Sequence, residues 1–288
     1  MSCALSLGTA NFGMNYGLGN NNKHLDSLHV KEILKTATNV GFSHLDTAAA
    51  YGDSEQILGQ LLPERKELHI TTKLRASDCS DVNSIIQAVK NSLRLTKQDQ
   101  FWSVLLHDSR VLLEGNSKEV RLGLNEIIDA GLAQHVGISA YNEFEIVQAK
   151  TVAPFLSVFQ IPENVCDQRS ANSSNLTALA SEGNLIFIRS IFLQGLLLMN
   201  PLSPRAKVMD AFSGLNALKI FCDKNRVSIL DLCVGYAKSL TWMSGLVFGV
   251  DSERQIHEIA SSFKTSIQVD YSGVPKLDHR LLDPRNWS

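Results

Sequence analysis

Four side chains that can exchange protons each follow a short apolar segment of the sequence. Asp46 and Tyr51 lie in one segment, and Lys73 and His107 come at the ends of two later ones. A phenol has a pKa near 10, so it needs a nearby cation before it can exchange a proton readily at neutral pH. Tyr51 is therefore a candidate proton donor only if the fold brings a cation such as Lys73 beside it.

Taken singly, each of these residues has an ordinary structural explanation. Asp46 is placed to cap a turn, and Tyr51 to pack against a rim. A lysine at a strand end, such as Lys73, is typical of a surface ion pair, and an isolated His107 is typical of a structural histidine. The chemical interpretation depends on elements that bring all four side chains together.

Apolar segments of strand length alternate with segments of helical periodicity along the whole chain. Eight such units in 288 residues predict an α/β fold, a (β/α)8 TIM barrel, in which residues 1–288 form a single domain. The expected strands are 4–8, 41–46, 68–73, 101–106, 135–139, 155–160, 185–190 and 245–249. The expected helices are 27–39, 54–62, 82–93, 120–128, 143–150, 176–181, 215–222, 228–236 and 252–263, and a glycine-rich loop is expected at 9–20.

The active site of such a barrel lies at the C-terminal ends of its strands. Asp46, Lys73 and His107 end the second, third and fourth expected strands, so they should share one mouth with Tyr51 from the following loop. Ser54 is expected to cap the helix after that loop. A doubly wound sheet is the rival fold, but its glycine-rich phosphate fingerprint is missing after the first strand.

Composition favours a small-molecule partner over nucleic acid or a membrane. The 27 basic and 29 acidic residues give a formal net charge of −2, and no basic run stands out. The five cysteines are scattered without a C-x-x-C pair, so we expect reduced thiols and no metal site. We expect a cytoplasmic protein, because the N-terminus lacks the features of a signal peptide and no apolar window is long enough to span a membrane. The sequence indicates no oligomeric state.

Residues 46–55 match the D-T-A-x-x-Y-G-x-S-E signature of the aldo-keto reductase family. The chain resembles that family along nearly its whole length, because Lys73 and His107 also match its third and fourth strand ends. The resemblance implies a reductase that transfers a hydride from NADPH, or from NADH, to a small-molecule carbonyl substrate. It implies that Tyr51 is the general acid and that His107 orients the carbonyl oxygen. Lys73, paired with Asp46, would stabilise the phenolate.

The same resemblance implies a set of cofactor-binding residues. Ser139 and Gln160 match carboxamide-binding positions, and 248–256 resembles the family's adenosine-phosphate loop. NADP rather than NAD follows from family habit alone. Gln255, where many members have arginine, and Ile259, where many have asparagine, weaken that inference. The expected set is Gly8, Thr9, Asp46, Ser139, Gln160, Ser190, Leu193, Gly249, Asp251, Arg254 and Gln255.

Two alternatives on the same barrel stay open. Ala140 stands where many members have asparagine, and such departures motivate a slow-turnover redox-sensing or binding subunit. A nicotinamide-retaining epimerase, which returns the hydride to its substrate, is the other. The segments 15–17 and 189–195 resemble bacterial reductases encoded with enzymes of surface polysaccharides, so a sugar-derived carbonyl is the expected substrate class. The other histidines are interpreted as structural: His24, His29, His44, His69, His135, His257 and His279.

Overall fold

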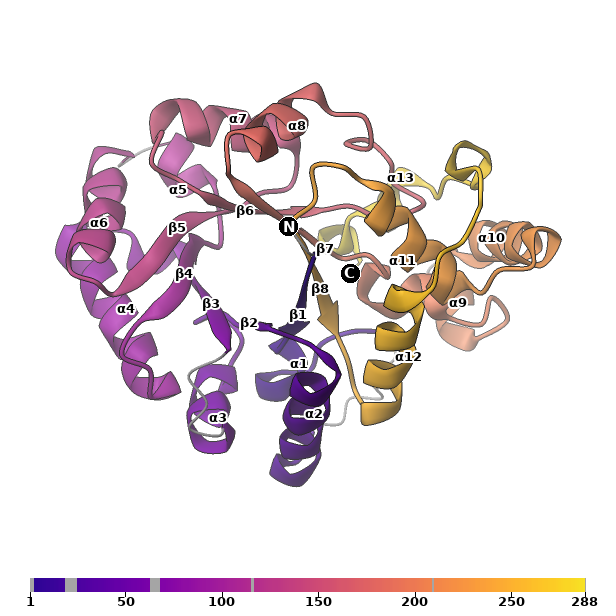
Figure 1. Ribbon diagram of the computed structural model, residues 1–288, viewed down its shortest axis with the longest axis horizontal. Coiled ribbons are helices and arrows are strands. Elements are labelled where there is room, and N and C mark those ends of the chain that lie inside the picture. Colours follow the sequence, from indigo (N-terminus) through magenta and orange to yellow (C-terminus); the bar gives the residue numbers. More distant parts are fainter. Residues whose placement is uncertain (1–2, 19–24, 63–67, 115–116, 209, 288) are drawn as a thin grey trace.

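Eight parallel strands form a closed barrel in the computed structural model, which describes residues 3–18, 25–62, 68–114, 117–208 and 210–287. The strand order follows the chain, and the first strand pairs with the last. Helices surround the ring of strands (Figure 1). The expected (β/α)8 barrel is thus confirmed. The strands are β1 (Ala4–Gly8), β2 (His44–Asp46), β3 (His69–Leu74), β4 (Phe101–Leu106), β5 (Ala133–Ser139), β6 (Val158–Pro162), β7 (Leu185–Arg189) and β8 (Gly245–Gly249).

Side-chain caps mark where most of the long helices begin. Asp26, Asp81, Asn142, Ser228 and Ser252 each accept a hydrogen bond from a backbone N–H in the first turn that follows. The helices are α1 (Ala10–Gly13), α2 (Ser27–Val40), α3 (Ser54–Leu61), α4 (Val82–Thr96), α5 (Arg110–Leu113), α6 (Ser117–Asp129), α7 (Glu143–Val152), α8 (Ser174–Ser181), α9 (Pro204–Val208), α10 (Phe212–Asn225), α11 (Ile229–Ser239), α12 (Glu253–Lys264) and α13 (His279–Leu282).

Some limits differ from the expected ones. α1 lies inside the segment expected to be a loop, and β6 begins at Val158 rather than at 155. β3 continues one residue past Lys73, because Leu74 still pairs with Leu106 of β4. Strand limits follow from pairing with a neighbour, which an apolar pattern alone does not specify.

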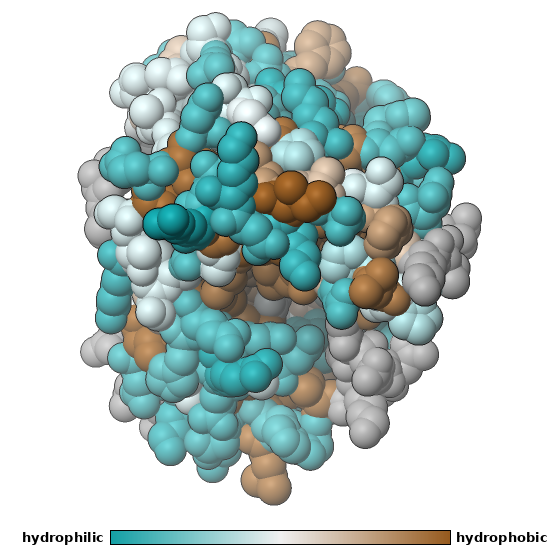
Figure 2. Space-filling view, turned by 90° about the vertical axis from the view of Figure 1, so that its right-hand side faces the viewer, coloured by the Kyte–Doolittle hydropathy of each residue, from teal (hydrophilic) through white to brown (hydrophobic). Residues whose placement is uncertain are grey.

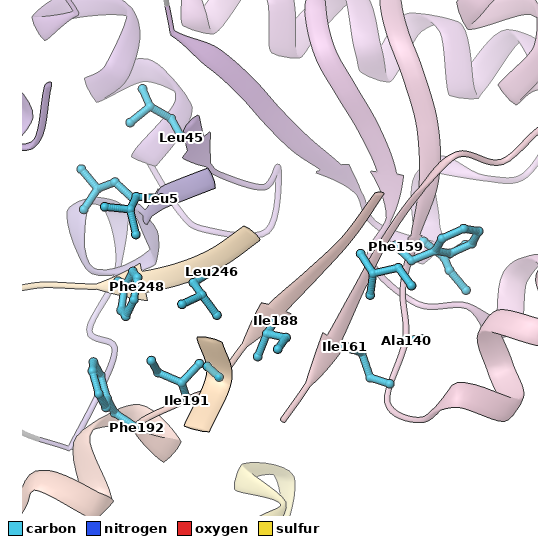
Figure 3. Packing of buried hydrophobic residues seen from close by; sticks show 14 of the residues in the cluster. Leu5, Leu45, Ala140, Phe159, Ile161, Ile188, Ile191, Phe192, Leu246 and Phe248 are labelled. Carbon is cyan, nitrogen blue, oxygen red and sulfur yellow. The ribbon is translucent and has the colours of Figure 1, made fainter. Parts of the chain in front are cut away.

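Successive side chains of a barrel strand alternate between the interior and the surrounding helices. In the interior, the hydroxyls of Thr71 and Ser103 hydrogen-bond at 2.8 Å, and Trp102, Leu105, Val158 and Phe187 form a small apolar cluster. A larger cluster lies between the strands and the helices, and Figure 3 shows part of it: Leu5, Leu45, Ile188, Leu246 and Phe248. These two packed regions hold the strand ends rigidly, which is what a site at the mouth requires.

Aromatic side chains fill the N-terminal end of the barrel. The ring of Trp102 lies 4.7 Å from His44, 5.6 Å from His69 and 5.2 Å from His135. Burial, with His69 nearby, lowers the pKa of His44 to about 4, so this imidazole is neutral at pH 7. These three histidines pack as structural residues at the end opposite the mouth, while His24 lies outside the described residues.

The outer surface is mixed in character. The face shown in Figure 2 is largely hydrophilic, with hydrophobic side chains interspersed among the polar ones. Within the described residues, no helix is both long enough and apolar enough to cross a membrane.

Candidate active site

A buried ion pair at the barrel mouth touches the phenol of the signature segment. Lys73 Nζ lies 2.6 Å from Asp46 Oδ2 and 3.4 Å from the Tyr51 hydroxyl, and it donates to the Thr47 carbonyl at 3.0 Å. Only 1% of the Lys73 side chain is exposed. Burial opposes the charge, but the Asp46 carboxylate and Tyr51 outweigh it and raise the pKa of Lys73 above its usual value. The phenol therefore faces a permanent cation.

Close backbone packing fixes the loop that carries Tyr51. Gly13 of α1 lies so near this loop that a Cβ atom there would overlap the Tyr51 carbonyl oxygen and the Ser54 nitrogen. Ser54 is not the helix cap expected from the sequence, because the cap position is Asp53. Its hydroxyl instead donates to the Thr9 carbonyl at 3.0 Å and lies 2.7 Å from Thr9 Oγ1. Ser54 thus ties the Tyr51 loop to the end of β1.

His107 directly follows β4 and faces Tyr51 across the mouth. The two rings are 5.7 Å apart and nearly perpendicular, at 84°. Burial, reinforced by the positive charge of Lys73, lowers the pKa of His107 to about 4. A neutral imidazole carries one N–H, so His107 is able to donate a hydrogen bond to a carbonyl oxygen placed beside Tyr51.

A pocket of about 520 Å³ runs from this mouth across the ends of β7, β8 and β1 to the start of α12. That volume is within the range of pockets that bind cofactors and drug-sized ligands. Phe248, Ile191 and Phe192, which Figure 3 shows near one another, line part of it. Eight of the expected catalytic and cofactor residues also line it: Gly8, Asp46, Tyr51, Ser190, Gly249, Asp251, Arg254 and Gln255.

The remaining expected cofactor residues lie outside this lining. Thr9 is fully buried, and its hydroxyl lies 3.1 Å from the Asp46 carbonyl. Leu193 is 1% exposed, and its N–H donates to the Ser190 carbonyl. Ser139, at the end of β5, pairs in register with Gln160, in the middle of β6, and both are buried. The structure thus brings the catalytic residues together but gives Thr9 a visible role only in packing.

Gln160 supplies a test of whether the site fits a nicotinamide. Its amide nitrogen donates to Asp46 Oδ1 at 2.5 Å, which leaves Oε1 buried and without a hydrogen-bond partner. A buried carbonyl oxygen left unsatisfied costs about 1–3 kcal/mol. The carboxamide NH₂ of a nicotinamide is a donor of the required kind, so these residues fit the cofactor that the sequence resemblance implies.

The far end of the pocket departs from expectation in one respect. Gln255 Oε1 accepts a hydrogen bond from the Asp251 N–H at 2.7 Å, so this side chain is engaged in its own turn. The Arg254 side chain is 83% exposed and lies 3.5 Å from Glu258. Gln255 is neutral and its oxygen is already engaged, so Arg254 is the cation available to a phosphate at this end.

Sequence reasoning gave no catalytic or cofactor role to three residues that line the pocket, Asn11, Tyr16 and Arg189, although the last two lie in the segments 15–17 and 189–195 noted above. Asn11 is buried and donates to the Val250 carbonyl, and its own carbonyl oxygen has no partner. Arg189 ends β7 just as Lys73 stands near the end of β3, so the strand-end signal that identified the lysine was also present there.

A backbone hydrogen bond joins two loops that line the pocket. Strands β1 and β7 each pair with β8 but not with each other. The N–H of Leu18, after β1, nevertheless donates to the carbonyl of Gln194, after β7, at 2.9 Å. Ser190 and Gln194 have positive φ angles of 63° and 52°, a conformation that costs non-glycine residues energy and recurs at ligand sites. We call this contact the Leu18–Gln194 bridge.

Comparison with known proteins agrees with this geometry. The model of the Aldo/keto reductase family matches residues 4–278. The chain belongs to the aldo/keto reductase family. Aldo-keto reductase AKR2E4 of Bombyx mori is 28% identical over 173 residues, which cover 54% of this chain and 56% of that protein. A probable voltage-gated potassium channel subunit beta of Oryza sativa is 24% identical over 271 residues, with 81% of each chain covered.

Solved structures of the family share the fold. The crystal structure of the Bombyx mori aldo-keto reductase in complex with NADP has a TM-score of 0.69 and 20% identity, and the match covers 98% of this chain and 92% of that one. The first curated relatives are matched over only about half their own length, 56% for the Bombyx mori protein. The fold and the family are therefore shown, and the activity follows as a proposal.

Proposed function

We propose that this aldo/keto reductase uses NADPH to reduce a small carbonyl compound, with Tyr51 as the general acid. The observation that carries the proposal is the buried Lys73 ammonium, which contacts both Asp46 and the Tyr51 hydroxyl. A fixed cation beside a phenol stabilises the phenolate that remains after proton transfer. Family membership supports the same reaction class.

Some residues of the mouth would stabilise charge during the reaction, and others would position the substrate. When bound, NADPH supplies the hydride to the carbonyl carbon. Tyr51 donates its hydroxyl proton to the carbonyl oxygen, and Lys73 stabilises the resulting phenolate. Asp46 keeps Lys73 charged despite burial, and neutral His107 donates a hydrogen bond that holds the carbonyl oxygen near Tyr51.

Two observations support NADPH as the cofactor. Gln160 presents an unsatisfied buried oxygen suited to a carboxamide, and Arg254 offers an exposed cation at the far end of the pocket. The Bombyx mori relative, whose structure contains NADP, shares the barrel and the family. Glu258 beside Arg254 weakens the attraction for a phosphate, so NADH stays an alternative.

The proposal is tested by binding and turnover together. NADPH and NADH are titrated into the protein with fluorescence and melting temperature as readouts, and aldehydes, including sugar-derived ones, are then added with NADPH deuterated at C4. We expect binding, steady oxidation of NADPH and transfer of deuterium to the alcohol product. If neither nucleotide changes the fluorescence or the melting temperature, the proposal is wrong.

The same experiment separates the alternatives. The match to a channel subunit over 81% of the chain favours, as a second candidate, a regulatory subunit that turns over slowly. Such a subunit would bind NADPH but complete about one turnover with every aldehyde. An epimerase would instead give a product of unchanged oxidation state without net loss of NADPH.

A further inference from the structure

Arg189 is a cation at the mouth that the proposed mechanism does not use. It ends β7 and has the same strand parity as Phe187, two residues earlier, which belongs to the cluster inside the barrel. Its side chain therefore leaves the strand toward the barrel axis, one layer above that cluster. It is half-buried and lines the same pocket as Tyr16, Asp46 and Tyr51.

The contacts of Arg189 orient the guanidinium without neutralising it. The group lies 4.9 Å from the centre of the Tyr141 ring, donates to the Ala140 carbonyl at 3.0 Å and reaches the Ser190 hydroxyl at 3.5 Å. Nε is buried without a hydrogen-bond partner. Over the described residues, no carboxylate forms an ion pair with this guanidinium, although an arginine removed from water is normally paired.

The other charges of the mouth cancel one another. Asp46 and Lys73 form a buried pair at 2.6 Å. His107 is neutral at pH 7 because its pKa is lowered to about 4. The neighbouring carboxylate, Asp108, is paired with the exposed Arg110. Arg189 therefore gives the mouth an uncompensated positive charge within the pocket that holds the proposed acid.

We propose that Arg189 binds an anionic group, a carboxylate or a phosphate, on the carbonyl substrate. This rests on the proposed reductase function and names its substrate class: small aldehydes or ketones that carry an anionic group. A planar guanidinium presents parallel N–H groups that match two oxygens of either anion. Because the Tyr141 ring and the Ala140 carbonyl already hold the group in place, less side-chain entropy is lost on binding.

The test compares matched substrates that differ in charge. Succinic semialdehyde is paired with butanal, and glyceraldehyde 3-phosphate with glyceraldehyde, and kcat/KM is measured for each with NADPH. Hydrogen bonds to charged groups contribute enough for a preference of about tenfold to a hundredfold. We expect at least one anionic member to exceed its neutral partner by that factor, and the better pair identifies carboxylate or phosphate. Equal kcat/KM values within both pairs would overturn the proposal.

Variants assign the preference to Arg189. In Arg189→Gln the ratio of anionic to neutral kcat/KM should fall at least tenfold, and in Arg189→Lys it should fall less, because the charge remains. Arg94→Gln, on the exposed face of α4, is the matched control and should keep the parent ratio. An unchanged ratio in Arg189→Gln contradicts the proposal. The affinities of Arg189→Gln for NADP⁺ and NADPH are measured as well. If these affinities change relative to each other while the ratio of anionic to neutral kcat/KM stays at the parent value, the guanidinium acts on the cofactor and the proposal is wrong.

A binding measurement judges the proposal even if no aldehyde is reduced. Succinate and inorganic phosphate are titrated by calorimetry into the parent protein and into Arg189→Gln, with and without NADPH. We expect one of these anions to bind the parent and to bind the variant at least tenfold more weakly. Anion binding that is lost in Arg189→Gln, without any turnover, would support the anion site at Arg189 and count against the reductase function. If neither anion binds, the proposal is wrong, whatever the activity toward neutral aldehydes.

Discussion

Removing the hydroxyl of Tyr51 tests its role in the chemical step separately from cofactor binding. In Tyr51→Phe the ring keeps its packing against His107, but the mouth loses its proton donor. We expect the rate of NADPH oxidation in a single turnover to fall by about 10²–10⁴, which is the range of general acid catalysis, while the NADPH dissociation constant stays near the parent value. Single-turnover kinetics and a fluorescence titration measure the two quantities. A variant with close to the parent single-turnover rate would remove Tyr51 from the mechanism.

Substitution of Lys73 should differ in its effect from substitution of Tyr51, because it also lowers the stability of the fold. Lys73→Met leaves the Asp46 carboxylate, whose side chain is 6% exposed, buried without its partner. We expect the free energy of unfolding to drop by about 3–5 kcal/mol and the single-turnover rate to fall as in Tyr51→Phe. Urea denaturation of Lys73→Met and of the double variant Asp46→Asn/Lys73→Met provides the comparison. The double variant should regain part of the stability but none of the activity; equal stability of the two would show that the buried charge is not the cause.

At the scale of elements, the contact between α1 and the Tyr51 loop determines where the phenol sits. In Gly13→Ala the new methyl group would overlap backbone atoms of Tyr51 and Ser54, so the loop must shift. We expect a loss of about 1–3 kcal/mol in stability and a lower kcat, since the phenol moves relative to Lys73. Gly273→Ala, which meets only Phe221 at 3.4 Å, is the control for a tolerated methyl group. Parent kcat in Gly13→Ala would mean that this contact does not position Tyr51.

Contacts between elements that lie far apart in the sequence could not all be predicted from it. Strand periodicity and strand-end residues predicted the barrel and the convergence of Asp46 and Lys73, because both follow from local patterns. The role of Ser54 depends on the end of β1, which lies 45 residues away in the chain. The engagement of Gln255 is local, because its partner is the backbone N–H of Asp251 four residues earlier, and the Ser252-x-x-Gln255 spacing at the helix start was a signal for it. The unpaired charge of Arg189 depends on neighbouring side chains, which no spacing encodes.

At the scale of the whole molecule, the histidines at the N-terminal end of the barrel link stability to pH. The pKa of His44 is about 4 in the folded protein and near 6.5 when unfolded, so the unfolded chain binds the proton more readily. The stabilisation from the neutral ring is complete above pH 6.5 and is lost as the pH falls toward 4. We expect this group to contribute on the order of 2 kcal/mol after allowance for its partial solvent contact.

Urea denaturation between pH 7.5 and 4.5 tests this linkage. His44→Gln should show a shallower loss of stability with falling pH, although some slope remains because burial also lowers the pKa of His135. His257→Gln, at an exposed position on α12, should keep the parent slope. An identical slope in His44→Gln and the parent would show that His44 does not drive the acid sensitivity.

The Leu18–Gln194 bridge bears on which step limits the rate of turnover. The two joined loops both line the pocket, so we expect release of a bound dinucleotide to require their separation. Nucleotide departure would then be slower than the chemical step, as happens in enzymes whose loops close over a ligand. Rapid mixing of the NADPH-loaded protein with a good aldehyde should show one fast oxidation per active site and then a slower steady rate set by exchange of spent nucleotide.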